Sequence, residues 1–333
     1  NKSKLDPMRK YFTVMATRGC PSNCNFCSLS TDIVRFRPIS HVLDEIEGKI
    51  RITGLRNVSF KDSSLTINKS FVRALCDGIL ERNLNIRWNC YSRADMSHEL
   101  IAYMRKAGCI SVEVALESGS PRILKSIGKG INLEKYLSFV EKAHSLGIKV
   151  WVFLIVSLTD ETYEDALKTL ELLKKSAPFV YDFGLQVTRI LPDTQLDQIA
   201  RDRGVLPENF DWFSPYKNEN ESLFKTDAYG TLPIYIEKMS VEEIQDILEK
   251  FEHIKETEFV YPDGFLDIIM MNLKLNMLRK LTLPKLLHKM GKFMVMLAHL
   301  GSTRKKIHSI NHSKVDIDAI PRPEWVEHRK RVW

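Results

Sequence analysis

Short apolar segments rich in β-branched residues alternate with amphipathic segments from residue 12 to about residue 189. The amphipathic segments repeat their apolar positions at helical spacing, and the apolar segments have the length of buried strands. This alternation predicts a parallel sheet joined by crossover helices. The predicted strands are Phe12–Thr17, Val58–Lys61, Ile86–Tyr91, Ser111–Leu116, Lys149–Val156 and Phe183–Thr188, and the predicted helices are Ile39–Lys49, Asn68–Glu81, Ser97–Lys106, Leu133–Ser145 and Glu161–Lys174.

Residues that start and stop helices agree with this pattern. Ser97 stands where an N-cap is needed, and Gly108 and Gly147 follow the ends of two predicted helices. Ser240 and Glu243 have the spacing of a capping box, which predicts one more helix, from Ser240 to His253. Six strand–helix units predict an α/β fold of the repeating barrel type, whose functional groups gather at the carboxyl ends of the strands.

The pattern divides the chain into three parts. Residues 1–11 form a lead-in, residues 12–256 form the barrel core, and residues 257–333 form a helical, basic extension. Within the core, residues 190–231 are rich in loops, with prolines and interleaved aromatic side chains. We interpret this segment either as a lid on the substrate side or as a packing segment over the open side of the barrel.

The positive charge belongs to the C-terminal extension. The chain has a formal net charge of +7, but residues 271–333 alone hold 14 Lys and Arg against 4 Asp and Glu. Residues 261–300 contain six of the eleven methionines among basic residues, so this stretch can form amphipathic helices that lie on a membrane surface or pack on the barrel. A nucleic acid is a less favoured partner, because the extension shows no recognisable RNA-binding module.

The N-terminus carries no apolar secretory region, and no uninterrupted apolar run is long enough to span a membrane. We therefore expect a cytoplasmic protein, with contact to the inner membrane surface as a further option. The sequence does not begin with methionine, so we expect it to be part of a longer protein.

Three cysteines follow the first predicted strand in a C-x3-C-x2-C spacing: Cys20, Cys24 and Cys27. A four-iron cluster takes four thiolates, so three thiolates would leave one iron with an open coordination position. A zinc site would need a fourth ligand, and the nearest histidine lies beyond a predicted turn. A disulfide suits small secreted domains. The other three cysteines fall on apolar faces and are predicted to be buried: Cys76, Cys90 and Cys109.

The cysteine segment, with Phe26 before the last cysteine and Thr-Arg-Gly-Cys-Pro at residues 17–21, resembles the radical S-adenosylmethionine (radical SAM) superfamily. The resemblance is to its cobalamin-binding branch, which is related to the methylthiotransferases. It implies a partial (β/α)6 barrel of the TIM type, a [4Fe-4S] cluster on the three cysteines, and S-adenosylmethionine on the open iron. It further implies an electron donor such as flavodoxin or ferredoxin, and cobalamin held by a domain that is not in this chain.

Strand ends downstream match the segments that hold S-adenosylmethionine in this family. The resemblance assigns its amino group to Asp62 and Ser63, its ribose and carboxylate to Glu117 and Ser118, and its adenine to the backbone of Gln186 and Val187, with Arg93 facing a carboxylate and Phe26 beside the cysteines. Two segments depart from the family pattern. Asp62 is followed by serine where relatives carry a second acidic residue, and residues 157–162, Ser-Leu-Thr-Asp-Glu-Thr, replace Gly-Leu-Pro-Gly-Glu-Thr, so we expect that turn to be made differently. Arg35 and Arg37 match a basic element that either steadies the cofactor or is simply solvated.

These observations predict an enzyme that cleaves S-adenosylmethionine reductively and functionalises a C–H bond. Cobalamin-assisted methyl transfer or carbon-skeleton chemistry on a small-molecule or lipid-like precursor is favoured. The alternatives are a methylthiotransferase-like enzyme that modifies RNA and an iron–sulfur protein without catalysis. No residue is assigned as catalytic acid, base or hydrogen donor, because substrate pockets in barrels are built from variable loops.

Overall fold

A computed structural model describes residues 10–29, 33–213 and 232–259. The chain separates into one unit up to Tyr261 and a second from Pro262, and all the described residues belong to the first. The predictions for the basic extension and for residues 261–300 therefore lie outside the described residues, apart from the last residues of one helix. No helix in the described part combines the length and apolar character that crossing a membrane requires.

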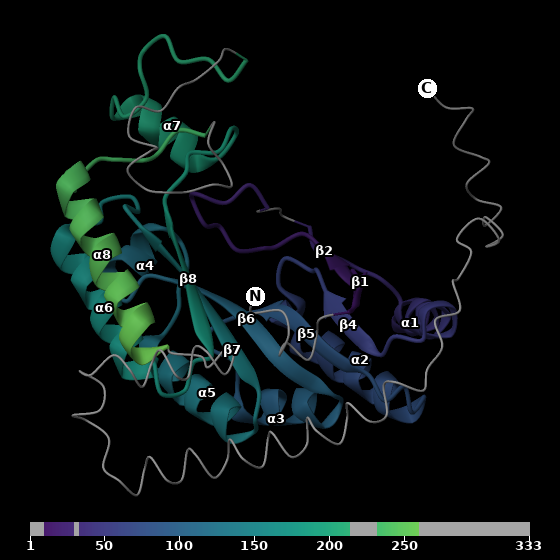
Figure 1. Cartoon of the computed structure of the whole chain (residues 1–333). Coiled ribbons are helices and arrows are strands. Elements are labelled where there is room, and N and C mark those ends of the chain that lie inside the picture. The colour runs from purple at the N-terminus through teal and green to yellow at the C-terminus, as the bar shows by residue number, and fades with distance from the viewer. Residues whose placement is uncertain (1–9, 30–32, 214–231, 260–333) are drawn as a thin grey trace, which may run out of the picture. The chain divides into compact units, whose positions relative to one another are not determined.

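Six parallel strands form one sheet in the order β1-β4-β5-β6-β7-β8. The connecting helices wrap around its outer side (Figure 1). This arrangement confirms the predicted α/β fold, a partial barrel. The strands are β1 (Phe12–Val14), β4 (Asn57–Phe60), β5 (Arg87–Ser92), β6 (Cys109–Glu117), β7 (Lys149–Val156) and β8 (Asp182–Val187); the helices between them are α1 (Ile39–Thr53), α2 (Lys69–Glu81), α3 (His98–Lys106), α4 (Pro121–Ser126), α5 (Leu133–Ser145) and α6 (Tyr163–Ser176), and α8 (Val241–Glu258) follows.

The core lies between the sheet and its outer helices. In β7 every second side chain is buried, whereas Trp151, Phe153 and Ile155 on the opposite face are half-buried. Because neighbouring strand residues point to opposite faces, this alternation gives the sheet one fully packed face and one concave face. Tyr136 and Phe139 of α5 are among the fully buried side chains on the packed side.

The predicted helix starts are confirmed. The Ser97 hydroxyl accepts from the backbone N–H of Leu100 at the start of α3. At the start of α8, Ser240 and Glu243 form the predicted capping box. These bonds satisfy N–H groups that have no partner within the helix.

The first predicted strand is too long. β1 ends at Val14, and residues 17–18 form a separate strand, β2 (Thr17–Arg18), which pairs antiparallel with β3 (Arg35–Phe36). The chain leaves the sheet because the buried carboxylate of Asp62 accepts from the backbone N–H groups of Ala16 and Thr17. Those two N–H groups are thereby removed from any ladder with β4.

The loop-rich segment contains a helix that periodicity did not predict, α7 (Gln195–Asp202). Phe210 and Trp212 pack against a small cluster built on Leu196 and Tyr235. The packing interpretation therefore applies to these two aromatic residues, whereas Phe213 is 97% exposed. Residues 214–231, which include Tyr216, lie outside the described residues.

The turn after β7 keeps a backbone that glycine favours, although it has no glycine. Ser157 and Asp160, which replace the two glycines of the family pattern, have φ of +64° and +63°. Non-glycine residues in this region cost roughly 1–3 kcal/mol each. The turn therefore has left-handed backbone at both positions although neither residue is glycine.

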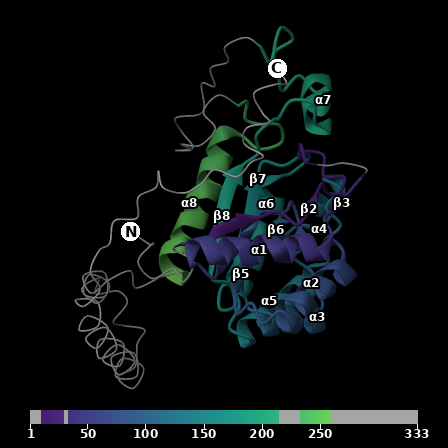
Figure 2. The same ribbon diagram turned by 90° about the vertical axis from the view of Figure 1, so that its right-hand side faces the viewer.

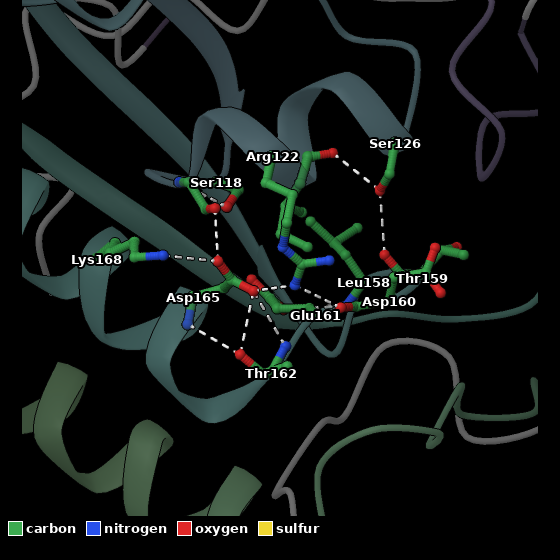
Figure 3. A network of polar contacts seen from close by, with 12 residues as sticks. Ser118, Arg122, Ser126, Leu158, Thr159, Asp160, Glu161, Thr162, Asp165 and Lys168 are labelled. Carbon is green, nitrogen blue, oxygen red and sulfur yellow. Dashed lines mark hydrogen bonds and ion pairs between the residues drawn. The ribbon is translucent and has the colours of Figure 1, made fainter.

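Polar contacts offset this strain. The Ser157 hydroxyl donates to the carbonyl of Tyr235, and Arg203 forms an ion pair with Asp160 at 2.7 Å. Arg122 donates to the carbonyl of Asp160 at 2.8 Å and pairs with Asp165 (Figure 3). Asp165 is buried and also accepts from Ser120 and Lys168, so one carboxylate joins α4, α6 and the turn.

Glu161 in this turn is 1% exposed and should make stability depend on pH. Burial, aided by Asp165 and opposed by the backbone of Leu158 and by Arg122, raises its pKa from 4.5 to about 7. The folded state therefore binds more protons than the unfolded state between these values, so the free energy of unfolding falls as pH rises from 4.5 to 7. Glu161→Gln should remove this fall and stabilise the fold at pH 8 by on the order of 3 kcal/mol.

Denaturant unfolding of both proteins across this pH range measures the difference. Exposed Glu171 lies on α6, so Glu171→Gln is the matched control and should leave the slope unchanged. Equal slopes for Glu161→Gln and the unmodified chain would contradict the prediction.

Candidate functional site

The loop that carries the three cysteines is held by backbone bonds at Asn25, which lies between Cys24 and Cys27. Its N–H donates to the carbonyl of Ile127, and its carbonyl accepts from the N–H of Leu196 at 2.8 Å. The Asn25 side-chain amide donates to Thr159 at 3.2 Å. Residues from the α4 turn, the β7 turn and α7 thus converge on one loop residue, which sequence reasoning missed.

The three cysteines line one cavity at the carboxyl ends of the strands. All three are free thiols, and Cys24 is 8% exposed. The remaining lining comes from the segments after β4 and β5, from the ends of β5 and β6, and from the segment after α4. The lining residues used below are Phe26, Ser63, Ser64, Arg93, Glu117 and Lys129.

The cysteine set fits a cluster with one ligand missing. The chain's other cysteines are buried in the core, as predicted: Cys76, Cys90 and Cys109. In the part of the chain that the structure describes, no three Cys, His, Asp or Glu side chains are gathered tightly enough for a single metal ion. Three free cysteines lining one cavity are compatible with a cluster that keeps one iron open, because each thiolate binds a different iron.

A buried ion pair faces the cysteines. Lys129 Nζ lies 2.8 Å from Glu117 Oε1, with the two side chains 18% and 6% exposed. Burial opposes the charge on Lys129, but Glu117 and Cys24 outweigh it and raise the lysine pKa. Burial likewise raises the pKa of the Cys24 thiol, and Lys129 opposes that rise. The cavity therefore holds a cation in a position to neutralise anionic groups.

Sequence reasoning missed Lys129, although a signal was present. Lys129 stands between Gly128 and Gly130, which both have positive φ, directly after α4. A lysine between two glycines of positive φ indicates a local backbone conformation that positions the lysine side chain.

Ser64 is a second missed residue. Its hydroxyl is buried and has no hydrogen-bond partner among the described residues, and the residue lines the cavity. A buried polar atom without a partner is costly, so it indicates a ligand or a water at that point. Asp62 is not among the residues that line the cavity: its Oδ1 accepts from the N–H groups of Ala16 and Thr17, and its buried Oδ2 has no partner among the described residues. Burial raises the pKa of this carboxyl against the bonds to Thr17 and Ala16.

Arg93 forms a two-bond ion pair with Asp95, at 2.9 and 3.1 Å. Glu117, another carboxylate at the cavity, pairs with Lys129. Because Arg93 also lines the cavity, the bond to Asp95 fixes the guanidinium at the rim.

Comparison with known proteins identifies the family. The model of the Radical SAM superfamily matches residues 14–173. Residues 14–173 form a radical SAM domain. An uncharacterised methyltransferase of Pyrococcus horikoshii is 34% identical over 182 residues, which cover 51% of this chain and 40% of that protein. The bacteriochlorophyllide d C-12(1)-methyltransferase of Chlorobaculum tepidum is 27% identical over 229 residues, covering 64% of this chain and 49% of that protein.

Among solved structures, the cobalamin-dependent S-adenosylmethionine radical enzyme OxsB, with aqua-cobalamin and S-adenosylmethionine bound, matches with a TM-score of 0.56. The match covers 85% of this chain and 45% of OxsB at 15% identity, so it supports the fold alone. The chain spans less than half the length of each of these relatives.

The structure brings together some of the predicted cofactor residues and not others. Phe26, Ser63, Arg93 and Glu117 line the cavity of the radical SAM domain with the cysteines. Asp62, Ser118, Gln186 and Val187 are not among the residues that line it. Ser118 is buried and bonded to Thr169 and Ser120, while Gln186 is exposed on β8 next to buried Val187. The roles of all eight in cofactor binding stay predictions.

Gly119, which follows Ser118, lies against the backbone of α6. A Cβ at this position would lie 2.6 Å from the Cα of Thr169 and 2.7 Å from the carbonyl oxygen of Lys168. The close approach that glycine permits here is therefore that of α6, which packs against the turn after β6.

Gly128→Ala should displace the cysteine loop. A Cβ there would lie 2.3 Å from the carbonyl oxygen of Asn23, and φ is +74°. We expect faster labelling of Cys24 by a thiol reagent in the metal-free protein and a loss of iron uptake on reconstitution. Gly130→Ala is the matched control, because Gly130 has φ of +58° and no atom within 4 Å of the added Cβ.

Gly130→Ala should cost only about 1–2 kcal/mol in stability, the strain of the left-handed conformation. Its Cys24 labelling rate should stay that of the unmodified chain. If Gly128→Ala and Gly130→Ala behave alike, the contact with Asn23 does not hold the loop.

Proposed function

We propose that the chain is the catalytic core of a radical SAM methyltransferase, and that Cys20, Cys24 and Cys27 hold a [4Fe-4S] cluster. The observation that carries the proposal is the cavity itself, which joins three free cysteines to a buried Lys129–Glu117 pair at the strand ends. The methyltransferase names of two relatives support the reaction class.

When bound, the cluster supplies the electron that cleaves the sulfonium of S-adenosylmethionine. The protein's own residues bind and orient the cofactor. We assign its carboxylate to Lys129, its ribose hydroxyls to Glu117, and its ammonium group to the hydroxyls of Ser63 and Ser64. A cation, a carboxylate and unpaired hydroxyls are the complementary partners of these three groups.

Arg93 and Phe26 complete the proposed binding surface. Arg93 stands at the rim as a fixed positive charge, since Asp95 holds its guanidinium. Phe26 is partly buried against two apolar clusters and excludes water from the cysteine loop. Exclusion of water strengthens each of the polar contacts inside the cavity.

Radical SAM enzymes need an electron donor and a substrate. We propose a flavodoxin or ferredoxin as donor and a small-molecule or lipid-like substrate. Cobalamin would be bound by a domain outside residues 1–333, since OxsB and the two relatives are more than twice as long as their matched regions.

The cluster assignment is tested by replacing each of Cys20, Cys24 and Cys27 with alanine and reconstituting the protein without oxygen. Each variant should fall from about four irons per chain to about one or fewer. Cys76→Ala is the control, because Cys76 is buried in α2 away from the cavity. The unmodified chain, once reduced, should convert S-adenosylmethionine to 5'-deoxyadenosine or S-adenosylhomocysteine. Full iron content without either product would refute the proposed function.

Lys129→Met should weaken S-adenosylmethionine binding about tenfold or more, because a charge-assisted bond is lost. The change in the electron paramagnetic resonance spectrum on titration with S-adenosylmethionine measures this affinity. Lys129→Arg should restore most of it, since the charge is kept. Lys125→Met, on the exposed face of α4, should have no effect. Unchanged affinity in Lys129→Met at full iron content would remove Lys129 from the cofactor site.

A further inference from the structure

Two arginines face each other on the ribbon formed by β2 and β3. Arg18 and Arg35 are directly opposite in the antiparallel register, and both are exposed. Neither forms an ion pair with any residue that the structure describes. In antiparallel pairs, like charges placed directly opposite are destabilising. The ribbon therefore keeps an unfavourable pair that its own folding does not require.

Nearby arginines behave differently. Arg37, two residues after Arg35, donates to Glu45 and to the carbonyl of Met15. Arg82, the C-cap residue of α2, pairs with Asp44 of α1. Among the described residues, carboxylates thus pair with Arg37 and Arg82, whereas no carboxylate pairs with Arg18 or Arg35.

The ribbon is fixed next to the cysteine loop. Arg18 lies two residues before Cys20, which lines the cavity. The N–H of Arg37 donates to the carbonyl of Ala16, and the Phe36 ring lies 5.0 Å from that of Phe71 on α2. In Figure 2 the two strands lie next to each other, on the opposite side of the view from α8. A partner bound to the ribbon would therefore sit beside the first cysteine.

Exposed apolar side chains flank the same loop. Leu29 is 59% exposed, and its N–H donates to the sulfur of Cys27 at 3.4 Å. Met15, which precedes Arg18 in sequence, is 39% exposed, and Phe36, which follows Arg35, is 40% exposed. Apolar side chains with charges around them are typical of protein interfaces, in which the charges guide association.

We propose that this basic ribbon, Arg18 and Arg35 with Phe36, is the docking surface for an acidic one-electron carrier protein of the flavodoxin or ferredoxin type. The inference rests on the proposed function, which requires a reductant. One electron passes from the reduced carrier to the cluster, the carrier is oxidised by one electron, and no atoms are exchanged. The positive charges of the ribbon complement an acidic carrier, and the ribbon lies close to Cys20, so the docked carrier would be near the cluster that it reduces.

Arg35→Glu tests the proposal without weakening the ribbon, because it replaces repulsion with attraction to Arg18. Binding of a purified flavodoxin to the full chain, with and without its cluster, should weaken about tenfold at low salt, mainly through slower association. The difference should vanish at roughly 0.5 M NaCl, where surface charges are screened. Arg35→Gln should fall between the two, which a purely structural role would not produce.

The control is Arg51→Glu, an equally exposed arginine near the far end of α1. It should bind flavodoxin like the unmodified chain. Reduction of the cluster by dithionite, which needs no docking, should be the same in all variants. Reduction by flavodoxin hydroquinone, followed by stopped-flow absorbance, should be slowed in Arg35→Glu, less so in Arg35→Gln, and not in Arg51→Glu.

Failure of this proposal and failure of the proposed function give different results. If dithionite and flavodoxin both reduce the cluster but no S-adenosylmethionine is cleaved, the function fails and the docking surface stands. If Arg35→Glu and Arg51→Glu bind flavodoxin and ferredoxin equally well, or if the unmodified chain binds neither at low salt, the docking surface fails alone. Loss of transfer RNA binding in Arg35→Glu with carrier binding unchanged would also overturn it, in favour of a nucleic-acid contact.

Discussion

The backbone of Asn25 is the point on which the cysteine site depends. Through its N–H, its carbonyl and its side-chain amide, it is bonded to the turn after α4, to α7 and to the turn after β7. Short loops between cysteines have little secondary structure of their own, so their shape must come from such external bonds. The barrel provides them at the carboxyl ends of its strands, and the loop adopts one arrangement as a result.

The fold could be read from the sequence because its signals are local. Burial alternates along β7, and the caps at Ser97 and Ser240 are made within three residues, so periodicity and capping locate these elements. What the sequence missed depends on distant contacts. β1 stops at Val14 because the Asp62 carboxylate accepts from the N–H groups of Ala16 and Thr17. The family resemblance assigns Asp62 to the amino group of S-adenosylmethionine. Short α7 is held by packing against Tyr235, which no local pattern reveals.

The residues of the candidate site were likewise predicted where the signal is local and missed where it depends on distant contacts. Cysteine spacing is a local signal, and the three cysteines do line one cavity with Glu117. Lys129 and Ser64 were not predicted, because their roles depend on their surroundings in the folded chain. Lys129 pairs with Glu117, twelve residues earlier, and the buried Ser64 hydroxyl has no partner among the described residues. Ser157 and Asp160 show the reverse, a departure in sequence that leaves the backbone conformation in place because Arg122 and Arg203 stabilise it.

The anchoring of Asn25 also sets an order of assembly. The cysteines lie in the first tenth of the chain, but the Asn25 side chain bonds to a residue 134 positions later, and its carbonyl bonds to Leu196. During synthesis the thiols therefore leave the ribosome well before the segments that shape their loop. Until then they are exposed to oxygen and to stray metal ions. The cysteine loop can therefore take its final shape only after the chain as far as α7 has been synthesised and has folded.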